Sequence, residues 1–333
     1  MADTQSTTIN AHAIRLHDYG GPEVLRYEEV AVPPPGPGEV RIANRAVGLN
    51  FIDVYQRSGV YKAASLPLVL GGEGAGVVES VGEGVAGLAP GDRVAYVLGD
   101  GAYAQVRLAP AARLVKIPES IDDKTAAAMM LKGMTVQYLL RRTYPVGPGT
   151  TILFHAAAGG VGLIFGQWAR HLGAVTIGTV SSPAKAELAL AHGFDHVIDY
   201  SREDFVARTR EITDGKGVDV VYDSVGKDTF PASLDCIKPR GLWVTFGQSS
   251  GMVPPFPPTL LSSKGSLFMT RPSLAHYTAT REDLVETAAD LFSAVGSGIV
   301  TIRVDNEYPL ADAARAHADL EARRTTGSTV LIP

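Results

Sequence analysis

The segment TILFHAAAGGVG, Thr151–Gly162, decides the fold of this chain. Its first five residues form a β-branched and aromatic run that predicts a buried strand, and the apolar residues after the segment recur at helical spacing as far as Leu172. Between strand and helix lies a small-residue turn, with Ala157, Gly159 and Gly162 in the three small positions of the pattern G-x-G-x-x-G. This order favours a dinucleotide site, with the pyrophosphate at the helix N-terminus, over a plain turn.

The region after residue 150 alternates strands and helices. Strands are predicted at 151–155, 175–180, 196–198, 218–223 and 242–246, with helices that include 183–192, 203–212 and 229–238. This rhythm predicts an α/β fold with a doubly wound parallel sheet. The first third of the chain instead contains short strands joined by glycine and proline turns, which predict an irregular β-barrel.

The composition limits the possible classes of protein. A chain of 333 residues is long enough for about two domains. Its 30 basic and 35 acidic residues give a net charge of −5 without a polybasic run, which argues against nucleic acid and anionic membranes as partners. The N-terminus lacks a secretory signal pattern, and no apolar run approaches the ~20 residues of a membrane span. The single cysteine, Cys236, excludes an internal disulfide and is expected to be a packed thiol, so we expect a cytoplasmic protein.

Several segments together resemble a known family. They are GLNFIDVYQRSGVY (48–61), GGEGAGVV (71–78), PGDRV (90–94), LKGMTVQYLL (131–140), HAAAGGVG (155–162) and VVYDSVG (220–226). In this order they resemble the zinc-independent medium-chain dehydrogenases/reductases, and among these the quinone oxidoreductases related to zeta-crystallin. The resemblance covers nearly the whole chain.

The resemblance implies a fold with two domains and a cleft between them. Residues 1–132 and 272–333 would form a GroES-like β-barrel catalytic domain, and residues 133–271 a Rossmann domain that binds NADPH. Relatives are commonly dimers or tetramers joined through the Rossmann sheets, so we expect a homodimer. Residues 265–270 would supply the edge strand for this pairing, although a strand buried within one subunit would have the same pattern.

A metal site is not expected. Zinc enzymes of the superfamily use a cysteine and the histidine of a GHE motif, but Asn50 and Gly72 stand at these positions here. One cysteine also cannot build a four-cysteine structural site. Without a metal, reduction of an electron-poor acceptor is favoured over oxidation of an unactivated alcohol.

The turn after the second strand of the predicted parallel sheet indicates the coenzyme. An NAD site usually has a carboxylate there, but this turn contains Ser181, Ser182 and Lys185, which suit a 2′-phosphate. Ser182 can also cap the next helix, and the two roles are compatible. The resemblance adds Tyr200 near the adenosine phosphate and Arg323 near the cofactor, with Arg324 as the alternative register.

The remaining cofactor contacts are expected at the carboxyl ends of the strands, where ligands of doubly wound sheets bind. Thr135 is expected to bind the cofactor from the helix before the sheet, although back-bonding within that helix is equally compatible with the sequence. The complete predicted cofactor set is Asn50, Thr135, Ala158, Gly159, Gly160, Val161, Gly162, Ser182, Lys185, Tyr200, Val225, Phe246, Gln248, Ser249, Arg271 and Arg323.

The acceptor side is expected to come from the first domain. Asn50 can donate a hydrogen bond to a carbonyl oxygen or to the nicotinamide ribose, and Tyr55 and Tyr61 can offer flat walls and hydroxyl groups. These three are the predicted catalytic residues. Asp53 either belongs to the same motif or caps the following helix.

These features favour an NADPH-dependent quinone reductase that transfers a hydride or electrons without a metal. One alternative is an NADPH-dependent reductase of α,β-unsaturated ketones or aldehydes, which needs the same geometry. A second is a non-catalytic, crystallin-like protein that binds nucleotide or RNA, against which the acidic balance argues.

Overall fold

The computed structural model describes residues 7–333; the first six residues, part of the segment read for a secretory signal, lie outside the described residues. The chain divides into two compact units, each described here by itself. The barrel unit contains residues 7–134 together with residues 278–296 and 302–333. The parallel-sheet unit contains residues 135–277 and 297–301.

Six parallel strands form the sheet of the parallel-sheet unit, in the order β11-β10-β9-β12-β13-β14. The order reverses next to β9, which confirms the predicted doubly wound topology. Their bounds are β9 Thr151–His155, β10 Val175–Val180, β11 His196–Asp199, β12 Val218–Asp223, β13 Ile237–Thr245 and β14 Phe268–Thr270. β14 lies at the edge of the sheet, as predicted for the segment 265–270.

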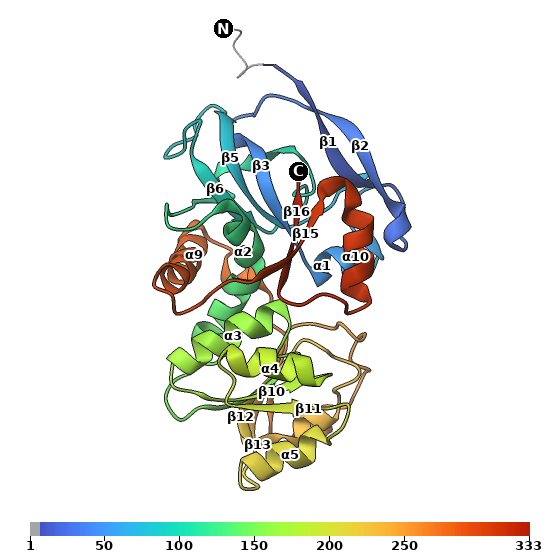
Figure 1. Ribbon diagram of the computed structural model, residues 1–333, viewed down its shortest axis with the longest axis vertical. Helices are drawn as coiled ribbons and strands as arrows, with labels where there is room; N and C mark the ends of the chain where they lie inside the picture. Colours follow the sequence, from blue (N-terminus) through green and yellow to red (C-terminus); the bar gives the residue numbers. More distant parts are fainter. Residues whose placement is uncertain (1–6) are drawn as a thin grey trace. The chain divides into compact units, whose positions relative to one another are not determined.

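Helices cover both faces of this sheet. In Figure 1, α3 and α4 lie on one side of the strands and α5 on the other. The helices are α3 Gly160–His171, α4 Pro183–Ala191, α5 Phe205–Ile212, α6 Ala232–Asp235, α7 Thr259–Ser263 and α8 Leu274–Tyr277. The core contains Leu153, Ile177, Val221 and the fully buried Trp243.

The helix predicted over 229–238 is wrong at both ends. Only α6 is helical there, because Pro231 is its N-cap and β13 already begins at Ile237, which pairs with Val218. Cys236 lies between α6 and β13, fully buried, and burial raises the pKa of its thiol to about 12. The sulfur is thus packed as expected, although outside a helix.

The barrel unit is built from antiparallel strands, apart from the parallel pair β15–β16. One sheet has the order β15-β16-β3-β5-β6-β8, with β7 paired to β3, and a second has the order β2-β1-β4. The strands are β1 Ile9–Leu16, β2 Leu25–Val32, β3 Glu39–Leu49, β4 Leu68–Val69, β5 Glu73–Val81, β6 Arg93–Val97, β7 Val106–Pro110, β8 Leu114–Lys116, β15 Val304–Pro309 and β16 Ser328–Ile332. The C-terminal part therefore returns to the barrel.

Three helices and three short 3₁₀ turns accompany these strands. The helices are α1 Phe51–Arg57, α9 Arg281–Gly296 and α10 Ala313–Glu321, and the turns are η1 Pro22–Val24, η2 Ala111–Arg113 and η4 Leu310–Asp312. The helix α2, Asp123–Tyr138, begins in the barrel unit and continues as the π-helical turn η3, Leu139–Thr143. Among residues 7–333, no helix is long and apolar enough to cross a membrane.

Candidate functional site

The small-residue turn after β9 leads directly into α3. Ala156 adopts a positive φ of 61°, and Gly159 is the N-cap of α3. The first-turn N–H groups of an α-helix have no partner within the helix, so those of Gly160, Val161 and Gly162 can donate hydrogen bonds to an anion. Gly159 is exposed and Gly160 and Val161 are half-buried, whereas Ala158 is buried. The turn therefore presents its backbone donors at the carboxyl end of β9.

Gly162 is needed for the contact between this turn and the helix. A Cβ added there would press on the carbonyl oxygen of Ala157 and lie 2.7 Å from that of Ala156. Ala157 in turn packs on β10, where a Cβ on Gly178 would lie 2.6 Å from the Ala157 methyl. Small residues at these positions let the helix N-terminus lie directly against the strands.

The turn after β10 gathers the predicted phosphate ligands. Ser182 caps α4 by accepting a hydrogen bond from the backbone N–H of Lys185, while the ammonium of Lys185 donates to the hydroxyl of Ser181 at 3.4 Å. Tyr200 follows the neighbouring strand β11; its backbone N–H donates to Val180 and it is 46% exposed. Capping and a half-buried cluster of hydroxyl and ammonium groups thus coexist at one turn.

A buried hydrogen-bond network shapes the loop after β12, and sequence reasoning missed most of it. The carboxylate of Asp223 accepts from the backbone N–H groups of Val225 and Gly226, at 2.8 and 3.1 Å, and from the Thr229 hydroxyl at 2.7 Å. Ser233 links this carboxylate to His155. The network therefore fixes the backbone of residues 223–226 at the end of β12.

The Asp223–Ser233–His155 arrangement is structural. All three side chains are at least 99% buried, and desolvation lowers the pKa of His155, so the imidazole is held neutral. A nucleophile must reach its substrate, which complete burial prevents. An aspartate at a strand end followed by a glycine turn was the only local signal for this network.

Arg271, after β14, contacts the loop that follows β13. Its guanidinium donates to the carbonyl oxygens of Thr245 and Gly247 at 3.2 Å and to the Gln248 side chain at 2.9 Å. Ser249 donates its backbone N–H to Ser224, and the Phe246 ring lies 5.8 Å from that of Phe154. Val225, Phe246, Gln248, Ser249 and Arg271 are thereby brought together at one end of the sheet.

The other predicted cofactor residues come from elements outside this sheet. Thr135 is 9% exposed within α2 and its side chain hydrogen-bonds Tyr138, three residues later. Arg323, just after α10 in the barrel unit, has a φ of 58° and an exposed side chain. Arg324 instead forms an ion pair with Asp319, so Arg323 is the arginine available to a ligand.

In the barrel unit, the three predicted catalytic residues lie on or next to α1: Asn50 is its N-cap, Tyr55 lies within it and Tyr61 follows it. Asn50 caps the helix, and its backbone N–H donates to the Asp53 carboxylate at 2.8 Å. Tyr55 and Tyr61 pack edge to face with ring centroids 5.4 Å apart, and the backbone N–H of Tyr61 donates to the Tyr55 carbonyl. Tyr61 is 40% exposed, so the pair offers aromatic surface outside the core.

One N–H group of the Asn50 amide already makes a hydrogen bond within the protein. Its Nδ2 donates to Glu73 Oε1 at 2.6 Å, and the ammonium of Lys132 lies 3.2 Å from the same oxygen. Lys132 also donates to the carbonyl oxygen of Leu49, and the other Glu73 oxygen accepts the backbone N–H of Leu131 at 2.6 Å. One N–H of Asn50 therefore remains for a ligand, rather than two.

A second buried network ties α1 to α10. Arg57 donates to both carboxylate oxygens of Glu321 at 2.8 Å and contacts His317 Nδ1 at 3.2 Å. The Tyr103 hydroxyl lies 3.2 Å from His317 and donates to Asp53 at 2.9 Å. Desolvation raises the pKa of Asp53 to about 7 and lowers that of His317 to about 3, so the imidazole is neutral.

These residues do not suit zinc. Among residues 7–333, no group of three or more His, Cys, Asp or Glu side chains is placed to hold a metal ion. At the positions of the expected ligands stand the Asn50 amide and Gly72, and the neighbouring Glu73 carboxylate is already neutralised by the Lys132 ammonium. A zinc ion needs thiolate or imidazole donors and would be repelled by this ammonium.

Comparison with known proteins gives the family. Residues 36–119 match the alcohol dehydrogenase GroES-like domain, and residues 160–294 match the zinc-binding dehydrogenase domain. The quinone oxidoreductase of Pseudomonas aeruginosa is 55% identical over 324 residues, which are 97% of this chain and 100% of that protein. The chain belongs to the quinone oxidoreductase family. This confirms the resemblance to the medium-chain dehydrogenases/reductases.

Two other members of the quinone oxidoreductase family extend the comparison. The solved structure of Escherichia coli quinone oxidoreductase complexed with NADPH superposes with a TM-score of 0.95 at 51% identity, covering 97% of this chain and 100% of that chain. The predicted GroES-like and Rossmann folds are thereby confirmed. The 2-haloacrylate reductase of a Burkholderia species is 49% identical over 325 residues, 96% of this chain and 98% of that protein.

Proposed function

We propose that this chain is an NADPH-dependent quinone reductase that works without a metal. The observation that carries this proposal is the near full-length similarity, at 51% identity, to a quinone oxidoreductase whose structure contains NADPH. When bound, NADPH supplies the hydride or the electrons for the acceptor. The protein supplies binding, orientation and hydrogen bonds.

The coenzyme is held by the carboxyl ends of the strands in the parallel-sheet unit. The pyrophosphate lies on the N-terminus of α3, where free backbone N–H groups and the helix dipole favour negative charge. Ser182, Lys185 and Tyr200 take the 2′-phosphate, since an ammonium attracts it and this turn has no carboxylate to repel it. The loops fixed by Asp223 and Arg271 flank the nicotinamide, and Thr135 and Arg323 add contacts.

The acceptor is held by residues of the barrel unit. The second N–H of Asn50 polarises the acceptor oxygen that gains negative charge, because the first is committed to Glu73. The rings of Tyr55 and Tyr61 stack on a planar acceptor, and their hydroxyl groups offer further donors. A quinone is already electron-poor, so it requires little further activation.

The coenzyme assignment is tested with Lys185→Glu. NADPH oxidation with 1,4-naphthoquinone, followed by the loss of NADPH absorbance, is expected to be much faster than NADH oxidation in the wild type. The variant should raise the KM for NADPH about tenfold or more while leaving that for NADH within about threefold, because a carboxylate repels the 2′-phosphate. Lys216→Glu, an exposed change of equal charge after α5, is the control. Unchanged discrimination by Lys185→Glu would refute the assignment.

A second candidate function is supported by the Burkholderia relative, named a 2-haloacrylate reductase. The same site would then reduce an activated carbon–carbon double bond. In the same assay, 9,10-phenanthrenequinone, an alkenal and 2-chloroacrylate are compared as acceptors. Higher kcat/KM for the alkenal or the haloacrylate than for both quinones would replace our proposal by this second one.

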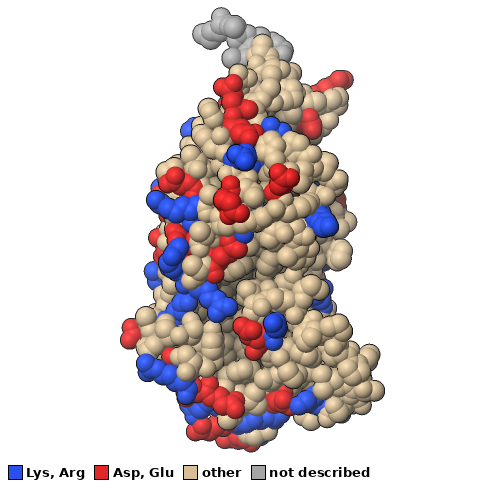
Figure 2. All heavy atoms as spheres, turned by 90° about the vertical axis from the view of Figure 1, so that its right-hand side faces the viewer, with Lys and Arg blue, Asp and Glu red and all other residues tan. Residues whose placement is uncertain are grey.

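Binding of nucleic acid is not proposed, and acidic and basic side chains are interspersed over the face in Figure 2.

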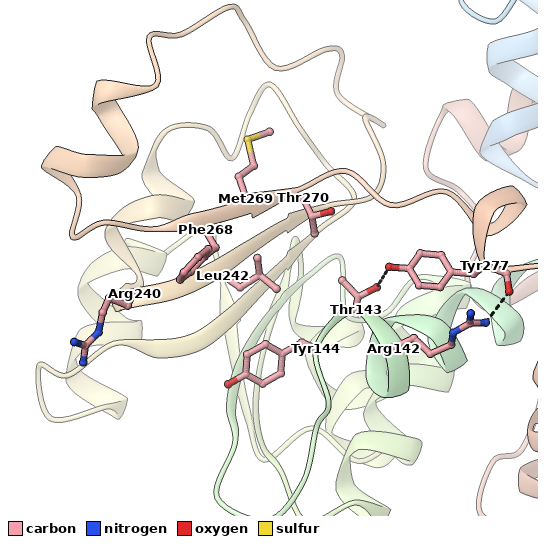
Figure 3. A pocket seen from close by; sticks show the side chains of 9 residues that line it. All are labelled: Arg142, Thr143, Tyr144, Arg240, Leu242, Phe268, Met269, Thr270 and Tyr277. Carbon is pink, nitrogen blue, oxygen red and sulfur yellow. Dashed lines mark hydrogen bonds between the residues drawn. The ribbon is translucent and has the colours of Figure 1, made fainter.

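We also propose that two copies of the chain pair through the edge strand β14. Phe268 is 63% exposed and Met269 39% exposed, and large apolar side chains on an open sheet edge favour association. A pocket of about 450 Å³ lies beside this edge (Figure 3), lined by Arg142, Thr143, Tyr144, Arg240, Leu242, Phe268, Met269, Thr270 and Tyr277. The occupant of this surface is the same strand of a second copy.

Sedimentation measures this association. The wild type is expected to sediment with about twice the 35.1 kDa mass of one chain, and Phe268→Asp combined with Met269→Asp as one chain. Met252→Asp alters an equally apolar but separate loop residue, 70% exposed, and should leave the mass unchanged. A dimer that survives the double change would exclude β14 as the site of association.

The cytoplasmic location expected from the sequence stays a proposal, supported by the free Cys236 thiol.

A further inference from the structure

Glu73 is a fully buried acidic group beside the proposed acceptor residue Asn50. It begins β5, its side chain is fully buried, and β3 makes room for it at Gly48, where a Cβ would collide with Glu73 Oε1. Its two oxygens accept hydrogen bonds from three donors: Asn50 Nδ2, Lys132 Nζ and the backbone N–H of Leu131. One of these donors, the Lys132 ammonium, also supplies the opposite charge. A buried carboxylate is stable only when it is paired and hydrogen-bonded in this way.

Among residues 7–333, Lys132 is the cation that contacts this carboxylate. It comes from α2 with a side chain that is 10% exposed, and it donates to Glu73 Oε1 at 3.2 Å and to the Leu49 carbonyl oxygen at 3.3 Å. A lysine is rarely buried to this extent without a charged partner. The ion pair therefore lies directly beside the Asn50 amide.

An amide can present either its oxygen or its nitrogen, and a neighbouring charge decides which. An ionised carboxylate accepts hydrogen bonds but cannot donate one, so it attracts the NH₂ group of Asn50 and repels the amide oxygen. The 2.6 Å contact between Asn50 Nδ2 and Glu73 Oε1 has this arrangement, and the Asn50 side chain also accepts from the backbone N–H of Asp53 in the capping box of α1. A protonated carboxyl could instead donate to the amide oxygen and would allow the flipped amide.

We propose that Lys132 is a positioning residue: by pairing with the Glu73 carboxylate, it fixes the oxygen that holds the Asn50 amide in one orientation toward the acceptor. This inference rests on the proposed function, in which Asn50 contacts the acceptor. Lys132 itself does not touch the reacting atoms in this scheme. It acts through Glu73, and Glu73 acts through Asn50.

Other titratable groups face Glu73 and must enter the test. Asp53 on α1, Tyr96 on β6 and Tyr103 before β7 all interact electrostatically with Glu73. Desolvation raises the pKa of Asp53 to about 7, so the wild type can carry a pH dependence of its own in this range. Because Lys132 lowers the pKa of Asp53 and Glu73 raises it, changes at either residue also shift this titration. The informative quantity is therefore the ratio of a variant to its parent at each pH, measured both in the wild-type and in an Asp53→Asn background.

The test is Lys132→Met, assayed with NADPH and 1,4-naphthoquinone between about pH 5.5 and pH 9. Loss of the cation favours protonation of Glu73 at low pH, where the amide is freed. At the acidic end, we expect kcat/KM for the quinone to fall about tenfold relative to the wild type, because the Asn50 amide no longer holds its hydrogen bond toward the acceptor. The ratio of the variant to the wild type should recover as the pH rises. NADPH affinity should stay within about twofold.

Two matched variants separate positioning from general damage. Lys132→Met combined with Glu73→Gln removes the titrating carboxyl, so its ratio to the wild type should not vary with pH. Lys124→Met, also on α2, breaks an exposed pair with Glu307 at 2.7 Å and should change nothing. If Lys132→Met fails to fold, Glu73→Gln alone should give a pH-independent loss, and wild-type activity in that variant would overturn the inference.

Asn50→Ala distinguishes this inference from the proposed function. If Asn50→Ala leaves quinone reduction unchanged, the acceptor site has been wrongly assigned and both proposals fall. If Asn50→Ala lowers kcat/KM but Lys132→Met follows the wild type at every pH, only the positioning role is refuted. A pH-independent loss in Lys132→Met would also refute it, since a merely structural role gives that result.

Discussion

Replacing Gly162 with alanine is expected to weaken NADPH binding by about tenfold to a hundredfold. The added methyl would press on the carbonyl oxygens of Ala157 and Ala156, which belong to the backbone and cannot rotate away. Overpacking of this kind costs about 1–3 kcal/mol and is relieved only when the start of α3 moves off β9. The N–H groups that would bind the pyrophosphate move with it. Fluorescence titration with NADPH and thermal unfolding measure the two effects.

Gly147→Ala is the matched control for this change. Gly147 lies four residues before β9, and a Cβ there would meet no atom within 4 Å. Its variant should bind NADPH as the wild type does. If Gly162→Ala also kept its affinity within about threefold, the turn after β9 would not be the pyrophosphate site, whatever the effect on stability.

Replacing Arg57 with methionine is expected to reduce the free energy of unfolding of the barrel unit by about 2–4 kcal/mol. Methionine keeps most of the length but leaves Glu321, His317 Nδ1 and the Gly20 carbonyl oxygen without their donor. The loss should stay below the largest values for buried pairs, because Glu321 is 36% exposed and regains water. Urea unfolding followed by far-UV circular dichroism measures this loss of stability, and the melting temperature provides a second measurement.

Arg315→Met serves as the reference for that experiment. Arg315 lies on the same helix α10 as His317, is 66% exposed and pairs with Asp312 at 3.7 Å. Exposed pairs of this kind contribute about 0–1 kcal/mol. Equal losses in the two variants would show that the Arg57 network contributes no more than a surface charge.

Local patterns predicted much of the parallel-sheet unit, although β13 begins at Ile237 rather than at residue 242. The strand–turn–helix at 151–172 and the alternation after it depend on neighbours in sequence, and β9, β10 and β12 begin and end where predicted. The segment 229–238 failed because pairing between Val218 and Ile237, nineteen positions apart, takes precedence over local helical periodicity. Helical spacing contains no information about such a pairing.

The buried networks could not be predicted for the same reason. Arg57 and Glu321 are separated by 264 positions, and Asn50 and Glu73 by 23. The sequence marked Asn50 because it stands in a recognisable motif, but nothing local indicated that its amide is partly occupied by Glu73. Lys132 stands in a quoted motif, yet its charge had no assigned partner until the fold brought β5 and α2 together.

The burial of Cys236 has a consequence for a catalyst that handles quinones. Quinones are electrophiles that alkylate exposed thiolates, and a thiol must ionise before it attacks. The only sulfhydryl of this chain is fully enclosed and, with a pKa of about 12, stays protonated at physiological pH. The proposed substrate therefore finds no cysteine nucleophile on the folded protein, which protects the enzyme from inactivation by its own substrate through sulfur arylation.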